Sequence, residues 1–304
     1  VDARSLRRLY TQVNYAEADL DNALSRAAEI GGQAARALLY QAAAKQNIPV
    51  ARGEIIISAI QTAREDDRYG PVIEVFKPLI DRIPPSPEMA WFALTAVRGY
   101  LTLGDRVGTE KWMALLRASA SVNPDAQLAL DRVRPLAWVL GVGAERANLD
   151  AMLTAWRQSI QERPELVPTQ ALMNAVIMAL GARLPKSAWD GSMTNAGGTA
   201  NMPPASEWLQ FRDVMLRWNS MVKSDADRRR SLAVASGVIP TSATDAQTLG
   251  VAELVIRTMN VMGDVDRGPR STHVIYETIS ALRQIGLIND ARQLAVESLI
   301  SAGL

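Results

Sequence analysis

Apolar residues recur along this chain every three or four positions, which places them on one face of an α-helix. The segment from Asp245 to Met262 carries such a stripe, and the segment from Gln33 to Gln46 carries another. The run Ile55-Ile56-Ile57 has the composition of a strand, but it continues into Ala59 and Ile60 without alternating polar residues. That continuation favours a helix there as well. The pattern predicts an all-α protein.

Prolines and glycines divide the apolar pattern at a constant interval. In four places a glycine follows a proline by seventeen residues and comes directly after Leu or Ile. Proline is tolerated in the first turn of a helix, because its missing N–H has no partner there, and glycine accepts the left-handed conformation that ends a helix. Each interval therefore predicts a helix with both ends marked. The four pairs are Pro87 and Gly104, Pro124 and Gly141, Pro164 and Gly181, and Pro269 and Gly286.

The spacing of these glycines also predicts how the chain is organised. Successive glycines at 104, 141 and 181 are 37 and 40 residues apart, which is in the range of helical-hairpin arrays. We therefore predict a right-handed array of antiparallel helical hairpins, an α-solenoid. The predicted segments are N-terminal capping helices (1–48), hairpin repeats (49–183), a long irregular loop (184–206), and C-terminal helices that end in a capping hairpin (207–304).

The N-terminal segment, residues 2–46, is predicted to form three short helices. Asn14 and Glu17 have the spacing of a capping box, in which each side chain accepts a hydrogen bond from the other's backbone N–H. A helix should therefore begin there, and Gly31-Gly32 should end it. One face of this helix carries four apolar residues, Leu20, Leu24, Ala27 and Ile30.

Helices in the repeats are predicted from the same signals. Their expected ranges are 50–65, a second helix that ends at Ile83, then 87–103, 109–120, 124–140 and 146–161, with a last helix over 289–302. Bulky residues at helical spacing usually belong to the core. Four tryptophans of these helices are therefore predicted to be core residues: Trp91, Trp112, Trp138 and Trp156.

The segment from Leu184 to Ser206 has no periodicity and is rich in Gly, Pro, Ser, Thr and Asn. Loops of this length are uncommon inside a compact domain unless they bind something, cover something or move. Two tryptophans belong to this region, and tryptophan is enriched among the anchors of protein interfaces. We therefore expect a partner-binding site formed by Trp189, Met202, Trp208 and Phe211.

Composition excludes several other functions. The chain has 33 Lys and Arg against 32 Asp and Glu, a net charge of +1, which argues against a dedicated nucleic-acid binder. It has no Cys, so disulfides and thiolate metal sites are excluded, and His273 is its only histidine. Ser271 and Glu277 lie near His273, but no nucleophile-elbow motif accompanies them. We predict no catalytic, metal-binding or cofactor-binding residue and no enzymatic activity.

The chain is also predicted to have no integral membrane segment. Its longest apolar run, Leu172 to Ala182, contains Asn174 and is much shorter than the roughly 20 residues that span a bilayer. The chain starts at Val1 with no signal-peptide pattern and has no cysteine. These two features favour a processed protein of the bacterial periplasm or cell envelope, although the compartment cannot be derived from them.

A short C-terminal pattern points to a family. Residues Ala281, Leu282, Ile285 and Gly286, followed by Ala291, Leu294 and Leu299, resemble the interior of a tetratricopeptide repeat. The similarity also touches Ala93 to Pro124 and Trp138 to Pro164, so about a third of the chain. The resemblance implies paired antiparallel helices stacked into a superhelix whose concave face binds peptides or partner proteins.

These observations lead to one preferred function and two alternatives. We expect a non-enzymatic helical-repeat scaffold that binds a protein or peptide, because stacked hairpins create an extended curved surface. The first alternative is a substrate-guiding superhelical domain of a larger cell-wall enzyme, which resembles soluble lytic transglycosylases in architecture only. The second is a structural subunit of a cell-envelope assembly. Self-association is left open.

Overall fold

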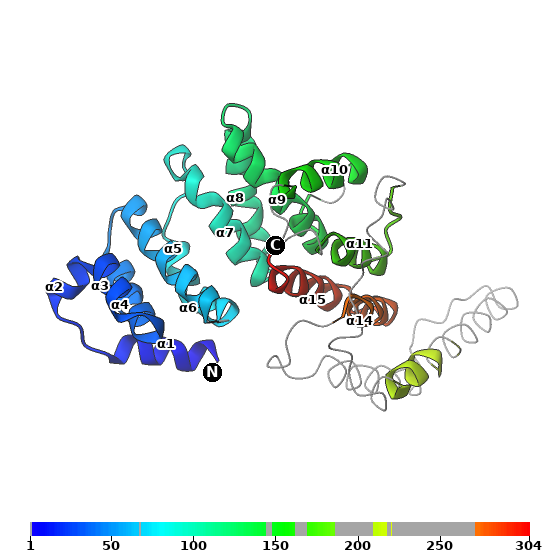
Figure 1. The fold of residues 1–304 in the computed structure, drawn as a ribbon, viewed down its shortest axis with the longest axis horizontal. Coiled ribbons are helices and arrows are strands. Elements are labelled where there is room, and N and C mark those ends of the chain that lie inside the picture. Colours follow the sequence, from blue (N-terminus) through cyan, green and yellow to red (C-terminus); the bar gives the residue numbers. More distant parts are fainter. Residues whose placement is uncertain are drawn as a thin grey trace, which may run out of the picture. The chain divides into compact units, whose positions relative to one another are not determined.

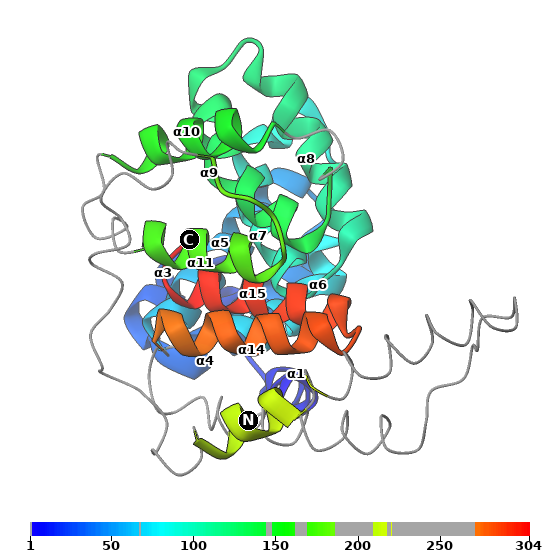
Figure 2. The ribbon, with the colours of Figure 1, turned by 90° about the vertical axis from the view of Figure 1, so that its right-hand side faces the viewer.

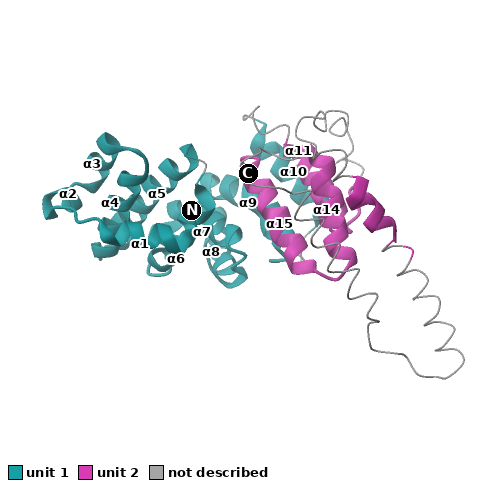
Figure 3. Cartoon of the chain, turned by 90° about the horizontal axis from the view of Figure 1, so that it is seen from below, with its two compact units in different colours: residues 1–162 teal, residues 163–304 magenta. Residues whose placement is uncertain are grey.

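The computed structural model describes residues 2–66, 68–143, 148–161, 169–185, 209–217, 220 and 271–304. All the regular structure in these ranges is helical, and none of their residues forms a strand, as predicted. The chain separates into two compact units, Val1–Glu162 and Arg163–Leu304 (Figure 3). The division falls inside the segment that was predicted to hold the repeats.

Unit 1 is a succession of helices in which each helix from α3 to α10 packs against the next one in the chain (Figure 1). Several helices also contact the next but one, as α2 does with α4, α4 with α6 and α7 with α9. The helices of this unit are α1 (Ala3–Gln12), α2 (Glu17–Asp21), α3 (Ala23–Ile30), α4 (Gly32–Lys45), α5 (Pro49–Glu65), α6 (Tyr69–Ile80), the 3₁₀ turn η1 (Pro87–Met89), α7 (Ala90–Thr102), α8 (Arg106–Ala120), α9 (Pro124–Leu140) and α10 (Leu149–Ile160).

The predicted capping box at Asn14 is wrong. Helix α2 begins at Glu17, its N-cap is Ala16, and no side chain caps it. Glu17 instead accepts a hydrogen bond at 2.7 Å from the ammonium group of Lys45 on α4. The helix also breaks at Asn22, so residues 2–46 form four helices and not three. A contact with a residue distant in the chain has replaced the local one.

Three aromatic rings hold α1 against the rest of unit 1. Tyr10 of α1, Tyr40 of α4 and Phe76 of α6 are all buried, with ring centroids 5.4 to 6.5 Å apart. Edge-to-face pairs of this kind contribute about 0.5–1.5 kcal/mol beyond the burial of their area. The three rings therefore hold α1 against both α4 and α6.

Two buried arginines satisfy polar atoms between helices. Arg36 of α4 is 4% exposed and donates to the Thr62 carbonyl at 3.0 Å, to Asp66 Oδ2 at 2.5 Å and to the Tyr10 hydroxyl at 3.3 Å. Arg52 of α5 is 5% exposed and donates to carbonyls at the C-terminal end of α4, including Ala43 at 3.2 Å. The last carbonyls of a helix have no partner within it. Arg52 therefore supplies the partner that α4 lacks.

The four predicted glycines all end helices. Gly104, Gly141, Gly181 and Gly286 have φ angles of 65°, 92°, 87° and 87°. In each case the glycine N–H donates to the carbonyl three residues back at 2.8–3.1 Å, and the next N–H donates to the carbonyl five residues back at 2.8–3.2 Å. This pair of hydrogen bonds is the Schellman motif, which needs a left-handed residue that glycine adopts without strain.

The helix starts agree less well with the prolines. Pro124 is the first residue of α9, as predicted, whereas Pro87 begins the 3₁₀ turn that precedes α7. Helix α14 begins at Thr272, where the Ser271 hydroxyl accepts a hydrogen bond from Val274 N at 3.3 Å. Pro164 and Pro269 lie outside the described residues.

The described part of unit 2 is built on three helices that contact one another: α11 (Thr169–Ala179), α14 (Thr272–Gln284) and α15 (Ile288–Ser301) (Figure 2). Ala281 of α14 and Ala291 and Ala295 of α15 are fully buried and belong to the core of this unit. Helix α11 packs on α14 although a long stretch of chain separates them. Sequence neighbours alone therefore do not define the packing of this unit.

The predicted tryptophan core is correct in part. Trp112 and Trp156 are 2% and 1% exposed, and Trp138 is partly buried. Trp91 is 45% exposed, so its assignment to the core is wrong. It lies in the first turn of α7 and covers Gly53 of α5, where an added Cβ would be 3.1 Å from the indole ring. One edge of the indole packs against α5, and the rest of the ring faces solvent.

Candidate functional site

Of the residues predicted to bind a partner, the structure describes only Phe211. Phe211 belongs to a helical stretch over 209–217 and has no exposed surface, so its ring is not available to a partner in this conformation. Trp189, Met202 and Trp208 lie outside the described residues, as does the predicted loop from Lys186 onward. The prediction that these residues form one site stays a prediction.

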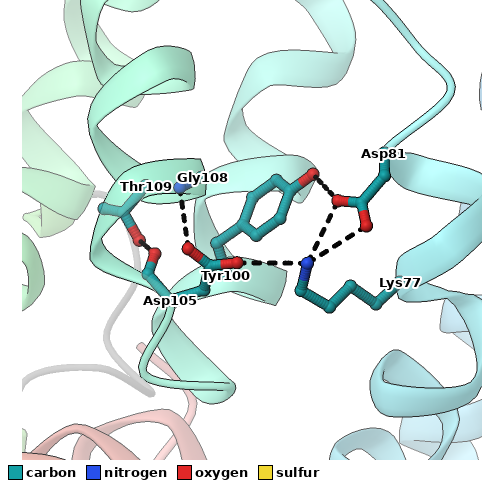
Figure 4. Close-up of polar contacts among 6 residues, drawn as sticks. All are labelled: Lys77, Asp81, Tyr100, Asp105, Gly108 and Thr109. Carbon is teal, nitrogen blue, oxygen red and sulfur yellow. Dashed lines mark hydrogen bonds and ion pairs between the residues drawn. The ribbon is translucent and has the colours of Figure 1, made fainter.

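A cluster of polar side chains joins α6, α7 and α8 within unit 1 (Figure 4). Lys77 and Asp81 come from the C-terminal end of α6, Tyr100 comes from α7, and Asp105 lies in the turn that leads into α8. Asp105 is the N-cap of α8 and accepts a hydrogen bond from Gly108 N at 2.9 Å. A side chain with this capping role has a fixed position. We call these four residues the polar cluster.

The lysine lies between the two carboxylates of the polar cluster. Its Nζ is 3.1 Å from Asp81 Oδ2 and 3.1 Å from Asp105 Oδ2. The Tyr100 hydroxyl donates to Asp81 Oδ1 at 2.7 Å, and Nζ of Lys77 lies 5.3 Å from the centroid of the Tyr100 ring. The tyrosine is 5% exposed, while the lysine side chain is 32% exposed. The cluster is therefore at the edge of the core.

The pKa values in the cluster move away from the range of acid–base catalysis at neutral pH. Burial, and then the hydrogen bond to Asp81, raise the pKa of Tyr100 well above its ordinary value of 10.0. Burial alone would lower the pKa of Lys77, but the hydrogen bonds to Asp81 and Asp105 outweigh it and raise this pKa. Burial alone would raise the pKa of Asp105, but the N–H of Gly108 and the Lys77 ammonium outweigh it and lower this pKa. A general base needs a pKa near the working pH.

The arrangement of the polar cluster therefore favours a structural role. At neutral pH the tyrosine keeps its proton, the lysine stays charged, and Asp105 stays ionised, so none of the three is prepared to exchange a proton. The contacts of the cluster connect the end of α6 to α7 and to the start of α8. The sequence signal for this cluster was present in part, since Lys77 and Asp81 have the i, i+4 spacing of a helical ion pair.

A second feature of unit 1 is a surface groove of about 770 Å³ between α2, α3, α4 and α5. Its buried lining residues are Ala23, Ala42 and Ile55. Its edges carry Leu24, which is 42% exposed, and Ile48, which is 61% exposed. We call this feature the N-terminal groove. It is apolar at its base because α3 and α4 present alanines where they meet.

The apolar face predicted for residues 20–30, which lies beside the N-terminal groove, is buried only in part. Ala27 is buried, but Leu24 and Ile30 remain 42% and 40% exposed. The four residues that share a face in the sequence are thus not all covered by the fold. The break at Asn22 leaves Leu20 on α2 and the other three residues on α3, where only Ala27 is covered.

Other chemistry is sparse where the chain is described. His273 is exposed in the first turn of α14, and the neighbouring Ser271 uses its hydroxyl to cap that helix. The described ranges contain no group of three or more His, Asp or Glu side chains placed to hold a metal ion. Among the same residues, no helix combines the length and the apolar character that crossing a bilayer requires.

Comparisons of the chain with protein-family models, with curated proteins and with solved structures gave no match in any of the three. The assignment of function therefore depends on the residues and their geometry.

Proposed function

We propose that this protein is a non-enzymatic helical-repeat scaffold that binds a protein or peptide partner. The observation that carries the proposal is the succession of contacts in unit 1, in which every helix from α3 to α10 packs on its neighbour in the chain. Helices arranged in this order form an extended surface of side chains from many helices. Proteins with that kind of surface bind segments of other proteins along it.

The helix ends support a repeated architecture. The same two hydrogen bonds close α7, α9, α11 and α14, each at a left-handed glycine. The buried alanines of α14 and α15 are in keeping with the resemblance to a tetratricopeptide repeat. A right-handed α-solenoid with repeats of about 37–40 residues is therefore the arrangement that we propose for the helical hairpins.

The polar cluster supports the non-enzymatic part of the proposal. Figure 4 shows its side chains in contact with one another, and these contacts shift the pKa values of Tyr100, Lys77 and Asp105 away from neutrality. Active sites usually show the opposite shift, because a catalytic acid or base must change its protonation state. The cluster instead connects neighbouring helices.

Affinity capture from the native cell tests the proposal. The full chain is used as bait beside a variant with Trp189→Ala and Trp208→Ala, and a variant with Val122→Ala, an exposed residue in a turn, serves as the matched control. We expect one protein to co-purify in stoichiometric amount with the full chain and the control, and to be lost with the double variant. If no protein is retained above background by any bait, the scaffold function is wrong.

The same experiment separates the two alternatives. A substrate-guiding role predicts that cell-wall glycan strands are captured, and a subunit of an envelope assembly predicts that the chain itself is the main partner. Sedimentation of the purified chain over a range of concentrations measures the second outcome directly. A chain that stays monomeric at high concentration speaks against the assembly subunit.

A further inference from the structure

The N-terminal groove is accessible and has a defined chemistry. Its apolar lining residues include Leu20 and Leu24 before and within α3, and Ile48, Ala51 and Ile55 at and within the start of α5. Polar side chains also line it: Asp21, Asn22, Ser25, Lys45, Gln46, Asn47 and Glu54. Leu24 and Ile48 expose large apolar surfaces that no other described residue covers. Exposed apolar surface of this kind, next to a hollow, is typical of interaction sites.

The shape of the groove favours a peptide over a small molecule. A small-molecule site is a cavity that encloses most of its ligand among mostly apolar side chains, with a few precisely placed polar groups. Here most of the lining side chains are exposed, and the buried ones are two alanines and Ile55, so the hollow is open to solvent and does not enclose a ligand. An amphipathic helix places apolar anchors at intervals of three and four residues and lays that face into such a groove. The groove thus fits one side of a helical segment.

The charges at the groove indicate the sign of the charge that its partner should carry. The groove carries one exposed cation, Lys45, and this ammonium is already paired with Glu17 at 2.7 Å and with Asp21 at 3.4 Å. Glu54 is exposed at the groove, and the described part of the chain forms no ion pair with it. The nearby Arg52 is 5% exposed, and its guanidinium donates to backbone carbonyls. A ligand therefore meets an excess of negative charge.

From this combination we infer that the N-terminal groove binds an amphipathic helical segment of a partner protein, with leucine-like anchors on one face and lysine or arginine beside them. The anchors pack between Leu24 and Ile48, and the cationic side chains lie next to Glu54. The inference rests on the proposed function, because it takes the ligand to be a peptide. It concerns residues other than Trp189 and Trp208.

The test uses the full chain and two synthetic probes in fluorescence anisotropy. Both are amphipathic peptides of about 14 residues, long enough for a helix of roughly 20 Å. One has Leu on its apolar face and Lys elsewhere, and the other has Glu in place of every Lys. We expect saturable binding of the Lys peptide, with at least tenfold weaker binding of the Glu peptide, and a loss of the preference at high salt.

Three variants locate the site. Leu24→Ser with Ile48→Ser removes both edges and should weaken binding of the Lys peptide at least tenfold. Glu54→Lys should weaken it by about threefold to tenfold and reduce its salt dependence. The matched control is Glu74→Lys, since Glu74 is also an exposed acidic residue within a helix of unit 1 but does not line the groove. It should bind the peptide as the unaltered chain does.

Several outcomes overturn the inference. These are the absence of saturable binding, a preference for the Glu peptide, or equal effects of Glu54→Lys and Glu74→Lys. Because all the substituted side chains are exposed, far-ultraviolet circular dichroism and thermal unfolding should match the unaltered chain. If the Lys peptide does not bind while capture of the native partner still depends on Trp189 and Trp208, the groove inference fails and the proposed function stands. If neither probe nor any native protein is bound, both fail.

Discussion

The ring of Tyr100 occupies the space in which Gly108 would carry a side chain. A Cβ added to Gly108 would lie 2.2 Å from Cδ1 of the tyrosine ring, far inside any tolerated contact. Helices α7 and α8 can therefore approach closely only because residue 108 is a glycine. The same ring carries the hydroxyl that donates to Asp81, so close packing and the polar cluster depend on each other.

Gly108→Ala is expected to destabilise unit 1 by about 1–3 kcal/mol, since either the buried ring or α8 must move to admit the methyl group. Urea unfolding monitored by circular dichroism measures the change. Gly70→Ala is the control, because Gly70 lies in α6 and a Cβ there meets nothing within 4 Å. The following residue, Pro71, disfavours a side chain on a helical residue before it, so the gain in helix propensity is offset and the change should be within about 1 kcal/mol. Equal effects of the two substitutions would contradict the packing argument.

Tyr100→Phe is expected to make unit 1 less sensitive to alkaline pH. The pKa of this tyrosine is raised in the folded protein above its ordinary value of 10.0, so its stabilising effect is complete below pH 10 and is lost as the pH rises further. One such group changes the free energy of unfolding by at most about 1.4 kcal/mol per pH unit. Phenylalanine keeps the ring and removes the titration.

The measurement for this variant is the urea midpoint at pH 7 and at pH 10.5, for the unaltered chain and for Tyr100→Phe. We expect a smaller loss between the two pH values in the variant. Lys77 contributes loss of the same sign, because its pKa is also raised, so part of the slope should remain. A slope identical to that of the unaltered chain would show that the hydroxyl does not titrate as argued.

Asp105→Asn separates the charge of this residue from its capping role. Asparagine caps a helix about as well as aspartate, so the hydrogen bond to Gly108 N should persist. The lost ion pair with Lys77 should destabilise the fold by about 0.5 kcal/mol at neutral pH, less at high salt. Because the pKa of Asp105 is lowered on folding, its contribution is complete above its ordinary value of 3.8 and fades as the pH falls below that value.

Thermal unfolding of the Asp105→Asn variant between pH 7 and pH 3 gives the required comparison. The difference from the unaltered chain should shrink toward zero at the acid end. A difference that grows at low pH would mean that the carboxylate is not the stabilised form.

Gly181 and Gly286 offer a matched pair in unit 2. Both have a φ of 87°, but a Cβ on Gly181 would lie 2.5 Å from Arg283 Nη1, while a Cβ on Gly286 meets nothing within 4 Å. Gly286→Ala should therefore destabilise only through the left-handed backbone, by about 1–2 kcal/mol. Gly181→Ala should destabilise slightly more, since the flexible arginine must also move.

The readout for this pair is the urea midpoint of each single variant and of each combined with Arg283→Ala. We expect removal of the arginine side chain to abolish the difference between the two alanine variants. A difference that survives would have to come from elsewhere in unit 2.

Helix ends could be predicted wherever the signal is local. Gly104, Gly141, Gly181 and Gly286 end helices because a left-handed residue is needed there whatever the rest of the chain does. The start of α8 was placed three residues late, at Thr109 and not Arg106, because the capping role of Asp105 went unrecognised. The sequence signal was the aspartate itself, which directly follows Gly104 and precedes the helix.

Predictions that depend on distant partners were less reliable. Glu17 has the right spacing for a local cap with Asn14, but Lys45 of α4 offers its carboxylate an ion pair instead. Trp91 has helical spacing like the buried Trp112, yet it is at the surface because α5 presents Gly53 only to one edge of its indole. Periodicity tells which residues share a face and does not tell what covers that face.

By itself, the order of residues determined the helical class and most helix ends, because the 3.6-residue period and the conformational needs of proline and glycine act within a few residues. Only the tertiary structure decided that Lys77 lies between Asp81 and Asp105, that Tyr100 fills the space beside Gly108, and that Leu24 and Ile48 border an open groove. These relationships join side chains from different helices. Their energies arise when helices pack, and no short stretch of sequence contains both partners.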